Sequence, residues 1–371
     1  MPAVKARQPV ASLFATGRKS LVNTAGQLGM GFDALLGLMG RSRPVNVMIS
    51  VTDRCPSRCA YCQIPEQGRP DLPTGVWKRM ISEMAAAGTR RIGVWGGEPL
   101  ARQDIVDICS HARSLGIYVS LDSNGYLVPS RPEILEAIDH LVLAYDGPEK
   151  AHDANRQPGS HARVTAAIDA SAGRVRLWTI TVLTRNNLHL IDEILDTARM
   201  KGFLTTFQTL HHNDKLGRNP EGMMPSREEY AEAFGHLLRR KREGAPIANS
   251  VRCLESLSRW PDYRKTTLPE RFHGTRCRAG AMYCNVDADG RLYPCSLLIG
   301  LSEDAPNAVE MGFEKAFRAL PPLPCQACVA GCYTEYNYLY GLSPSVALDW
   351  YRSVRRTDRA AKEAAAGLPG Q

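Results

Sequence analysis

The stretch CPSRCAYC places Cys55, Cys59 and Cys62 within residues 55–62. Three thiols this close in the chain can bind metal together, but a structural zinc site takes four tetrahedral ligands. The next Cys or His after Cys62 is Cys109, which lies within a helix-like pattern. Three cysteines without a near fourth instead fit an iron–sulfur cluster in which one iron keeps an open position for a cofactor or substrate.

A second group of cysteines lies near the other end of the chain. Nine of the 11 cysteines fall into these two groups. In a reducing compartment, clustered cysteines more often bind metal or take part in catalysis than form disulfides. The clustering therefore argues for two metal centres. The second group consists of Cys277, Cys284, Cys295, Cys325, Cys328 and Cys332.

Strands and helices must alternate to position the first group. Six β-rich runs, 45–51, 91–96, 117–123, 140–147, 176–184 and 203–210, are separated by helix-like segments such as 74–88, 101–116 and 187–202. Strict alternation predicts right-handed βαβ units and a parallel sheet. Six units are too few for a closed eightfold barrel. We therefore expect the α/β class with an open, partial (β/α)6 TIM-type barrel.

Polar or glycine-rich turns follow the first four strands. CPSRCAYC follows the first strand, and Gly96-Gly97-Glu98-Pro99 follows the second. Ser123-Asn124-Gly125 and Asp146-Gly147 follow the third and fourth strands. The carboxyl ends of parallel strands meet at one edge of the sheet, where such folds carry out their chemistry. We expect all four turns to converge there.

The three-cysteine loop and the GGEP turn, in this order and at these strand ends, resemble the radical S-adenosylmethionine (radical SAM) superfamily over residues 45–245. The resemblance implies a [4Fe–4S] cluster on Cys55, Cys59 and Cys62, whose open iron binds SAM. It also implies reductive cleavage of SAM to a 5′-deoxyadenosyl radical, which abstracts a hydrogen atom from the substrate. A reductant such as flavodoxin or ferredoxin would supply the electron.

The same resemblance suggests residues that contact SAM. The GGEP turn would expose backbone groups, and Glu98 would meet the ammonium group of the methionine moiety. Residues at later strand ends would contact ribose, adenine or carboxylate, although each also suits a plain role in a turn or cap. The candidates for SAM binding are Gly96, Gly97, Glu98, Pro99, Ser123, Asn124, Asp146 and Arg185.

The run YDGPEKAHDANR, residues 145–156, resembles radical SAM enzymes with a C-terminal SPASM or twitch extension. The later cysteines are similar to the twitch pattern, with Cys277, Gly290 and Cys295 followed by Cys325-x2-Cys328. The resemblance implies one fully ligated auxiliary [4Fe–4S] cluster, which would act in electron transfer. Cys277, Cys295, Cys325 and Cys328 are its expected ligands, and either Cys284 or Cys332 could replace one of them.

These patterns divide the chain into four parts. We expect a basic N-terminal arm (1–44), the radical SAM barrel (45–245), a small twitch/SPASM-like auxiliary cluster domain (250–340), and a C-terminal helix and tail (341–371). CNVDADGRLYPC, residues 284–295, reads as a hairpin because a turn signal separates two short strands.

Composition indicates a globular protein of the cytoplasm. The chain has 371 residues, 44% of them hydrophobic, and a net charge of +8. No stretch reaches the roughly 18 uninterrupted apolar residues of a membrane span, and no secretory signal is evident. Six basic residues against the single acid Asp33 make the arm cationic. Peripheral contact of this arm with a membrane surface is one hypothesis, and a solvated arm is the alternative.

The sequence favours a small-molecule substrate from specialised, cofactor or lipid metabolism. Peptide-modifying relatives often carry a leader-recognition domain before the barrel, and the segment before Val45 is too short for one. The alternative function is a peptide maturase that works with a separate recognition partner. A zinc-stapled protein that binds nucleic acid is a remote alternative, because the arm lacks the interleaved aromatic residues of a base-stacking surface.

Overall fold

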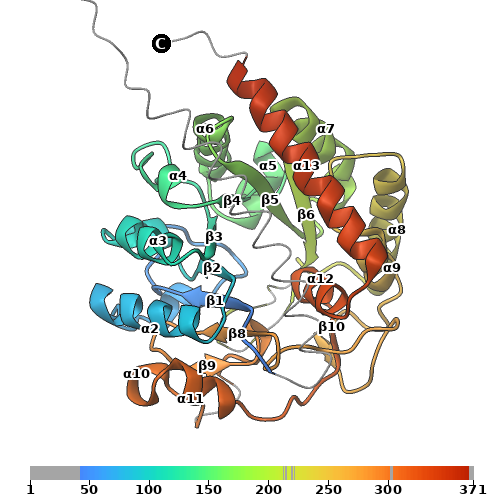
Figure 1. The fold of residues 1–371 in the computed structure, drawn as a ribbon. Helices are drawn as coiled ribbons and strands as arrows, with labels where there is room; N and C mark the ends of the chain where they lie inside the picture. Colours follow the sequence, from blue (N-terminus) through green and yellow to red (C-terminus); the bar gives the residue numbers. More distant parts are fainter. Residues whose placement is uncertain are drawn as a thin grey trace, which may run out of the picture.

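Six parallel strands run through the first two thirds of the chain (Figure 1). The computed structural model describes residues 42–366 except 212, 214, 219, 221 and 301–303. The strands pair in sequence order, so the predicted partial (β/α)6 barrel is confirmed. They are β1 (Asn46–Ser50), β2 (Arg91–Trp95), β3 (Tyr118–Ser123), β4 (His140–Ala144), β5 (Arg176–Leu183) and β6 (Leu204–Thr209).

The helices between these strands bury apolar stripes against the outer face of the sheet. In α2 (Thr74–Ala86), the stripe of Trp77, Met80, Ile81 and Met84 is 0% exposed and follows the spacing of helical turns. The other helices of this part are α3 (Ile105–Ser114), α4 (Ile134–Ala137), α5 (Glu149–Asn155), α6 (Ser160–Ser171), α7 (Ile191–Lys201), α8 (Arg227–Arg242) and α9 (Val251–Ser258).

The C-terminal part of the chain extends the barrel sheet. The predicted hairpin is present, with β8 (Tyr283–Val286) antiparallel to β9 (Leu292–Tyr293). In addition, β8 pairs in parallel with β1, so the sheet order is β6-β5-β4-β3-β2-β1-β8-β9. The sequence did not predict this pairing, which places the second cysteine group beside the strand that leads to the first.

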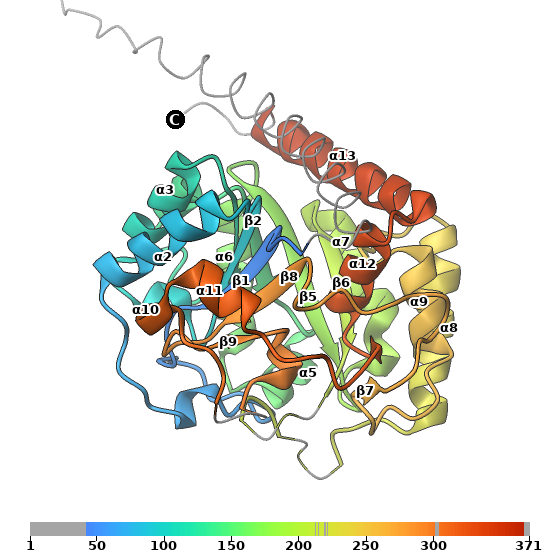
Figure 2. The same cartoon turned by 60° about the horizontal axis from the view of Figure 1, so that its bottom comes forward.

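Short elements precede and follow the hairpin in the chain (Figure 2). A two-stranded sheet pairs β7 (Thr267–Leu268) with β10 (Ala327–Cys328). The remaining helices are α10 (Ala308–Met311), α11 (Phe313–Arg318), α12 (Gly331–Tyr340) and α13 (Pro344–Ala366).

Helix α13 covers the amino end of the barrel. Arg176, at the start of β5, forms an ion pair with Asp358 at 2.8 Å. The rings of Trp178 and Trp350 meet edge to face with centroids 5.9 Å apart. This end is therefore packed by side chains, and the opposite, carboxyl end carries the turns that the sequence singled out.

Within the described residues, no helix is both long and apolar enough to cross a membrane. The arm proposed to contact a membrane surface lies almost wholly in residues 1–41, which are outside the described residues.

Candidate active site

The backbone pairing of β1 with β2 continues beyond the ends of both strands. The amide of Gly97 donates to the carbonyl of Thr52 at 2.7 Å, and the amide of Glu98 donates to the carbonyl of Arg54 at 2.8 Å. The next residue is Cys55. These bonds therefore fix the start of the cysteine loop against the GGEP turn.

The two glycines of this turn are required by close backbone contacts. Gly96 has φ +134°, and a Cβ there would lie 2.5 Å from the carbonyl oxygen of Thr52. At Gly97 a Cβ would lie 2.4 Å from the carbonyl oxygen of Arg54. Both contacts are far shorter than a carbon and an oxygen tolerate, and backbone atoms cannot turn aside. The glycines thus allow the two turns to approach each other.

Hydrogen-bond donors surround two of the three sulfurs in the loop. The backbone amide of Ser57 lies 3.4 Å from Cys55 Sγ, and Asn124 Nδ2 lies 3.6 Å from the same atom. The Ser57 hydroxyl lies 3.3 Å from Cys59 Sγ. Donors at these positions stabilise thiolates, so the loop provides a partly prepared site for anionic sulfur.

The chemistry of this donor set fits an iron–sulfur cluster. Burial raises the pKa of Cys55 to about 12 and that of Cys62 to about 11, so the thiolate forms need the positive charge of bound iron. In the described part of the chain no three His, Cys, Asp or Glu side chains converge on one metal ion. Each thiolate of a cluster binds a different iron, so cluster ligands need not converge in that way.

Glu98 is buried at the base of the GGEP turn. Its carboxylate accepts hydrogen bonds from the amide of Leu100 at 3.0 Å, the Ser123 hydroxyl at 2.9 Å and the amide of Asn124 at 2.8 Å. Burial raises its pKa to about 7, although these three bonds lower it. The structure therefore gives Glu98 a role that the sequence did not predict, because it ties the turn after β2 to the turn after β3.

Ser123 and Asn124 extend this connection towards the cysteine loop. Ser123 accepts from the amide of Gly125 at 2.9 Å while it donates to Glu98. The backbone amide of Asn124 donates to Glu98, and its side-chain amide donates to Cys55 Sγ. Pro99 is buried and begins a short 3-10 helix. These side chains lie at the predicted edge, and contact with SAM stays a prediction for them.

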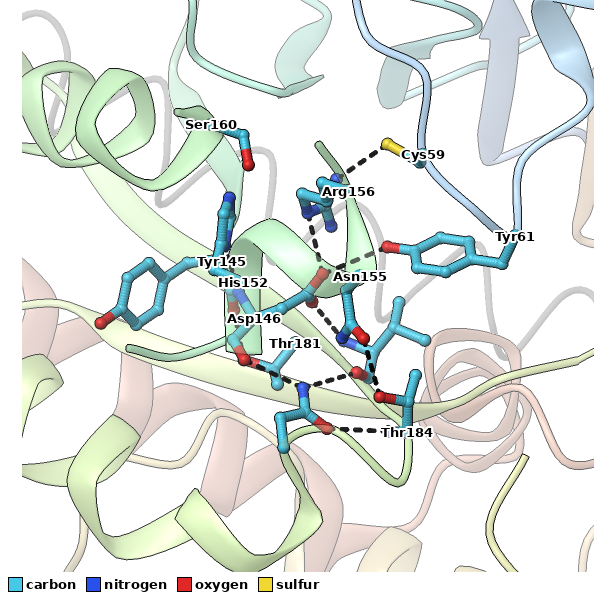
Figure 3. Close-up of polar contacts among 12 residues, drawn as sticks. Cys59, Tyr61, Tyr145, Asp146, His152, Asn155, Arg156, Ser160, Thr181 and Thr184 are labelled. Atoms are coloured by element: carbon cyan, nitrogen blue, oxygen red, sulfur yellow. Dashed lines mark hydrogen bonds and ion pairs between the residues drawn. The ribbon is translucent and has the colours of Figure 1, made fainter. Parts of the chain in front are cut away.

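Asp146, at the end of β4, lies at the centre of a buried network (Figure 3). Its Oδ2 accepts from Arg156 Nε at 2.8 Å and from the Tyr61 hydroxyl at 3.2 Å. Its Oδ1 accepts from the amide of Val182 at 2.9 Å. Arg156 Nη1 in turn lies 3.8 Å from Cys59 Sγ. The network therefore links β4 and β5 to the cysteine loop.

The backbone of Asp146 is held on both sides as well. Its amide donates to His152 Nδ1 at 3.0 Å, and its carbonyl accepts from Asn187 Nδ2 at 2.9 Å. Asp146 is 0% exposed and both carboxylate oxygens have protein donors. The prediction that Asp146 contacts SAM is therefore corrected, because its side chain is already used to position Arg156 and Tyr61.

Arg185 lies away from this network. Its guanidinium Nε is 3.5 Å from Glu229 Oε2, at the start of α8, and its side chain is 49% exposed. Its backbone amide donates to the carbonyl of Met223 at 2.9 Å. The structure thus directs Arg185 towards α8, and contact with SAM stays a prediction for it.

Sequence reasoning missed three residues near the first cysteine group. Arg156 appeared only as part of a motif that marks the subgroup, and Tyr61 only as a letter of the stretch CPSRCAYC. Ser57 was not singled out at all. The spacing of His152 and Arg156 after Asp146 was the available signal, since both side chains return to that aspartate.

The structure brings the four predicted auxiliary cysteines together. Burial raises the pKa of Cys295 well above its usual range, and Cys277 and Cys325 raise it further. Burial likewise raises the pKa of Cys328, with additional effects from Cys277 and Cys295. Such mutual effects require the sulfurs to be neighbours. The four thiols therefore fit a fully ligated second cluster, and they would hold it between the hairpin and the loop before α12.

Tyrosines of the hairpin and of α12 pack against each other beside the auxiliary cysteines. The ring of Tyr283 stacks on that of Tyr333, with centroids 5.4 Å apart. Asn337 Oδ1 accepts from the Tyr283 hydroxyl at 2.9 Å and from the amide of Arg278 at 2.8 Å. The aromatic run of α12 therefore packs the cysteine-bearing segments against the barrel.

The two alternative ligands differ in their surroundings. Cys284 is 1% exposed within the apolar core beside β1, and burial alone raises the pKa of its thiol. Cys284 is thus corrected to a core residue. Cys332 neighbours Cys328 but also faces Asp122 of β3 and Gln208 of β6. Cys332 therefore faces the inner side of the barrel as well as the auxiliary site.

Asp122 is an acidic group on the inner face of the sheet. Successive side chains of a strand point to opposite faces of the sheet. The neighbouring Leu121 lies in the hydrophobic core outside the sheet, and Ser123 donates to Glu98. Burial raises the pKa of Asp122 to about 6, and Arg91 opposes this shift. A carboxylate with such a pKa can take up or release a proton near neutral pH.

Comparison with known proteins identifies the family and relatives of this chain. A family model described as "Radical SAM superfamily" matches residues 49–198. The chain is 30% identical over 264 residues to the PqqA peptide cyclase of Rhizobium meliloti, which covers 68% of this chain and 67% of that protein. It is 27% identical over 312 residues to the PqqA peptide cyclase of Gluconobacter oxydans, covering 77% of this chain and 83% of the relative.

Two solved structures share the fold. Streptococcus suis SuiB bound to its precursor peptide SuiA superposes with a TM-score of 0.59 at 14% identity, over 74% of this chain and 65% of that chain. The chain therefore spans slightly less than two thirds of SuiB. The enzyme anSMEcpe, with AdoMet and the Cp18Cys peptide bound, superposes with a TM-score of 0.59 at 16% identity, over 86% of this chain and 99% of that chain.

The close approach of the two turns predicts that Gly97→Ala will impair the first site. An added Cβ must displace the backbone before Cys55, so we expect lower iron and sulfide content after anaerobic reconstitution and a stability loss of about 1–3 kcal/mol. Gly75→Ala is the matched control, because nothing lies within 4 Å of a Cβ there. Equal iron content in the two variants would contradict the argument.

The position of Cys284 predicts a separation between stability and cluster content. Cys284→Ser buries a hydroxyl in apolar surroundings and should cost about 1–3 kcal/mol of unfolding free energy. It should leave iron per chain unchanged, whereas Cys295→Ser should remove roughly the iron of one cluster. Metal analysis and denaturant titration test this together, and loss of iron in Cys284→Ser would return that residue to the ligand set.

Acid should destabilise the fold through His152. Burial lowers its pKa from 6.5 to about 4, so the unfolded chain binds the proton more tightly than the folded chain between these values. Stability therefore falls as pH decreases through this window, by up to about 3 kcal/mol from this residue. His152→Asn keeps an acceptor for the amide of Asp146 and should lose less stability between pH 7 and pH 5. Identical pH dependence in denaturant titrations would argue against this assignment.

Proposed function

The chain belongs to the radical SAM superfamily, and from this membership we propose that it is a peptide maturase that works with a separate recognition partner. The observation that carries the proposal is the match to PqqA peptide cyclases over about two thirds of both chains at 30% identity. The proposed substrate is accordingly a ribosomally made peptide, modified at one or more of its side chains.

The relatives correct the expectation of a small-molecule substrate. The enzymes that match over 68% and 77% of this chain are named for a peptide, and SuiB has been solved with a precursor peptide. The earlier inference relied on the short segment before Val45, but a recognition domain need not be part of the same chain. The zinc-stapled alternative is dropped too, because the chain is a radical SAM enzyme.

When bound, the cluster and SAM would supply a radical that removes one hydrogen atom from the substrate. The residues of this chain would hold and orient those groups. Cys55, Cys59 and Cys62 would bind the cluster, and Gly96 and Gly97 would bring exposed backbone close to it. Excluding water from this edge would protect the radical from side reactions.

Formation of a new bond within the peptide removes a second hydrogen, as a proton and an electron. The four thiols Cys277, Cys295, Cys325 and Cys328 leave no free iron position, so the auxiliary cluster would accept this electron without contacting the peptide. Asp122 is our candidate for the proton, because it lies on the inner face and has a pKa near 6. The proton and the electron of the second hydrogen thus each have a proposed acceptor.

Anaerobic turnover tests the proposal. The reconstituted enzyme would be incubated with dithionite, SAM and candidate precursor peptides, with and without a candidate recognition protein. We expect 5′-deoxyadenosine together with a peptide that has lost two hydrogen atoms, detected by mass spectrometry. A deuterium label on the modified residue should appear in 5′-deoxyadenosine.

Variants separate the two sites in this assay. Cys55→Ala should abolish 5′-deoxyadenosine, whereas Cys325→Ala should reduce the peptide product more than SAM cleavage. Asp122→Asn should resemble Cys325→Ala if the proton is taken there. Release of 5′-deoxyadenosine with a labelled small molecule as the hydrogen source, and with every peptide unchanged, would refute the peptide assignment.

A further inference from the structure

Arg156 is a buried cation directed at one sulfur of the cysteine loop (Figure 3). Its side chain is 8% exposed, and Nη1 lies 3.8 Å from Cys59 Sγ. The Ser57 hydroxyl also lies near this sulfur, at 3.3 Å, and it is uncharged. Arg156 thus brings the only full positive charge among the hydrogen-bond partners described for Cys59.

Asp146 fixes the orientation of the Arg156 guanidinium. Asp146 accepts from its Nε at 2.8 Å, which leaves the outer nitrogens free to face the loop. The guanidinium also lies over the ring of Tyr61, 5.9 Å from the ring centroid, and Tyr61 donates to the same aspartate. A planar guanidinium held at one edge presents its other edge in a defined direction. The ion pair is therefore a directed dipole with its positive end at Cys59.

A buried ion pair that only stabilised the fold would not need this direction. Burying both charges carries a desolvation penalty that often cancels their attraction. The positive end could have pointed to a backbone carbonyl, as Arg102 does when it donates to the carbonyl of Val51 at 2.9 Å. Here it points to a sulfur that would carry negative charge when a cluster is bound. The placement thus favours an electrostatic role towards the cluster.

Reduction adds one negative charge to an iron–sulfur cluster. Hydrogen bonds to ligand sulfurs and nearby positive charge stabilise the reduced state and raise the reduction potential. Low exposure strengthens this effect, because little water screens the charge. The reducing electron comes from an outside donor such as flavodoxin, so a higher potential makes that transfer more favourable.

We propose that Arg156, held by Asp146 and Tyr61, is a positioning residue that raises the reduction potential of the cluster on Cys55, Cys59 and Cys62. The inference depends on the [4Fe–4S] cluster that membership of the radical SAM superfamily implies, and it does not depend on the peptide substrate. Arg156 acts through Cys59 Sγ by its charge and its N–H contact, and it takes no part in the chemistry of the substrate.

A redox titration of the reconstituted holoenzyme tests this, without peptide. The reduced clusters are followed by electron paramagnetic resonance, and the signal that changes when SAM is added identifies the cluster on the three-cysteine loop. R156Q should make reduction about tenfold less favourable, a shift of about 59 mV to more negative potential for a one-electron couple. R156K keeps the charge but cannot reach both Asp146 and Cys59, so its potential should lie between those of R156Q and the wild type.

Arg218 provides the matched control. Its Nη2 lies 3.4 Å from the carbonyl oxygen of Cys62, but its side chain is 46% exposed and does not donate to a described sulfur. R218Q should therefore change the potential far less than R156Q. An R156Q potential equal to that of the wild type, or an equal shift in R218Q, overturns the proposal. If R156Q does not fold or take up iron, R156K decides, and an unshifted R156K potential also overturns it.

Discussion

The hydrogen bonds that continue from β1 and β2 past the ends of the strands are the constraint on which the first site depends. They hold the segment from Thr52 to Arg54 against Gly97 and Glu98, so the first cysteine starts from a fixed point. A Cβ on either glycine would lie only 2.4 Å or 2.5 Å from a backbone carbonyl oxygen, well inside the van der Waals contact distance. The GGEP turn is therefore first a structural support, and any direct contact with SAM depends on that support.

The two cysteine groups differ in what surrounds them. The first lies at the carboxyl edge of the barrel, where all three thiols are partly exposed and polar donors reach two of them. In the second, Cys295, Cys325 and Cys328 are buried and tyrosines pack the segments that carry them. An open edge suits a cluster that must admit SAM, whereas close packing suits one that only exchanges electrons. The parallel pairing of β8 with β1 links the two, because it places the hairpin between Cys277 and Cys295 directly beside the strand that leads to the first group.

The sequence predicted those features that depend on local pattern. The six strands, the hairpin and the outer helices follow from alternation and turn signals, and the structure has them. It did not predict the pairing of β8 with β1, since a four-residue strand carries no information about a partner far away in the chain. It also assigned Asp146 to SAM, because position after a strand does not determine where a side chain points. Asp146 turns inward to Arg156, and Arg185 turns outward to Glu229.

Local sequence pattern does not determine the nature of the substrate, for a physical reason. A radical from the partial barrel and an electron path through the proposed auxiliary cluster would serve a peptide or a small molecule equally well. The fold of anSMEcpe, which was solved with a peptide bound, matches this chain over 99% of the length of anSMEcpe. The side chains of Asp122, Gln208 and Cys332 lie near one another although they come from three separate elements. Their meeting is a property of the folded chain, so the evidence for a peptide had to come from relatives whose substrate is named.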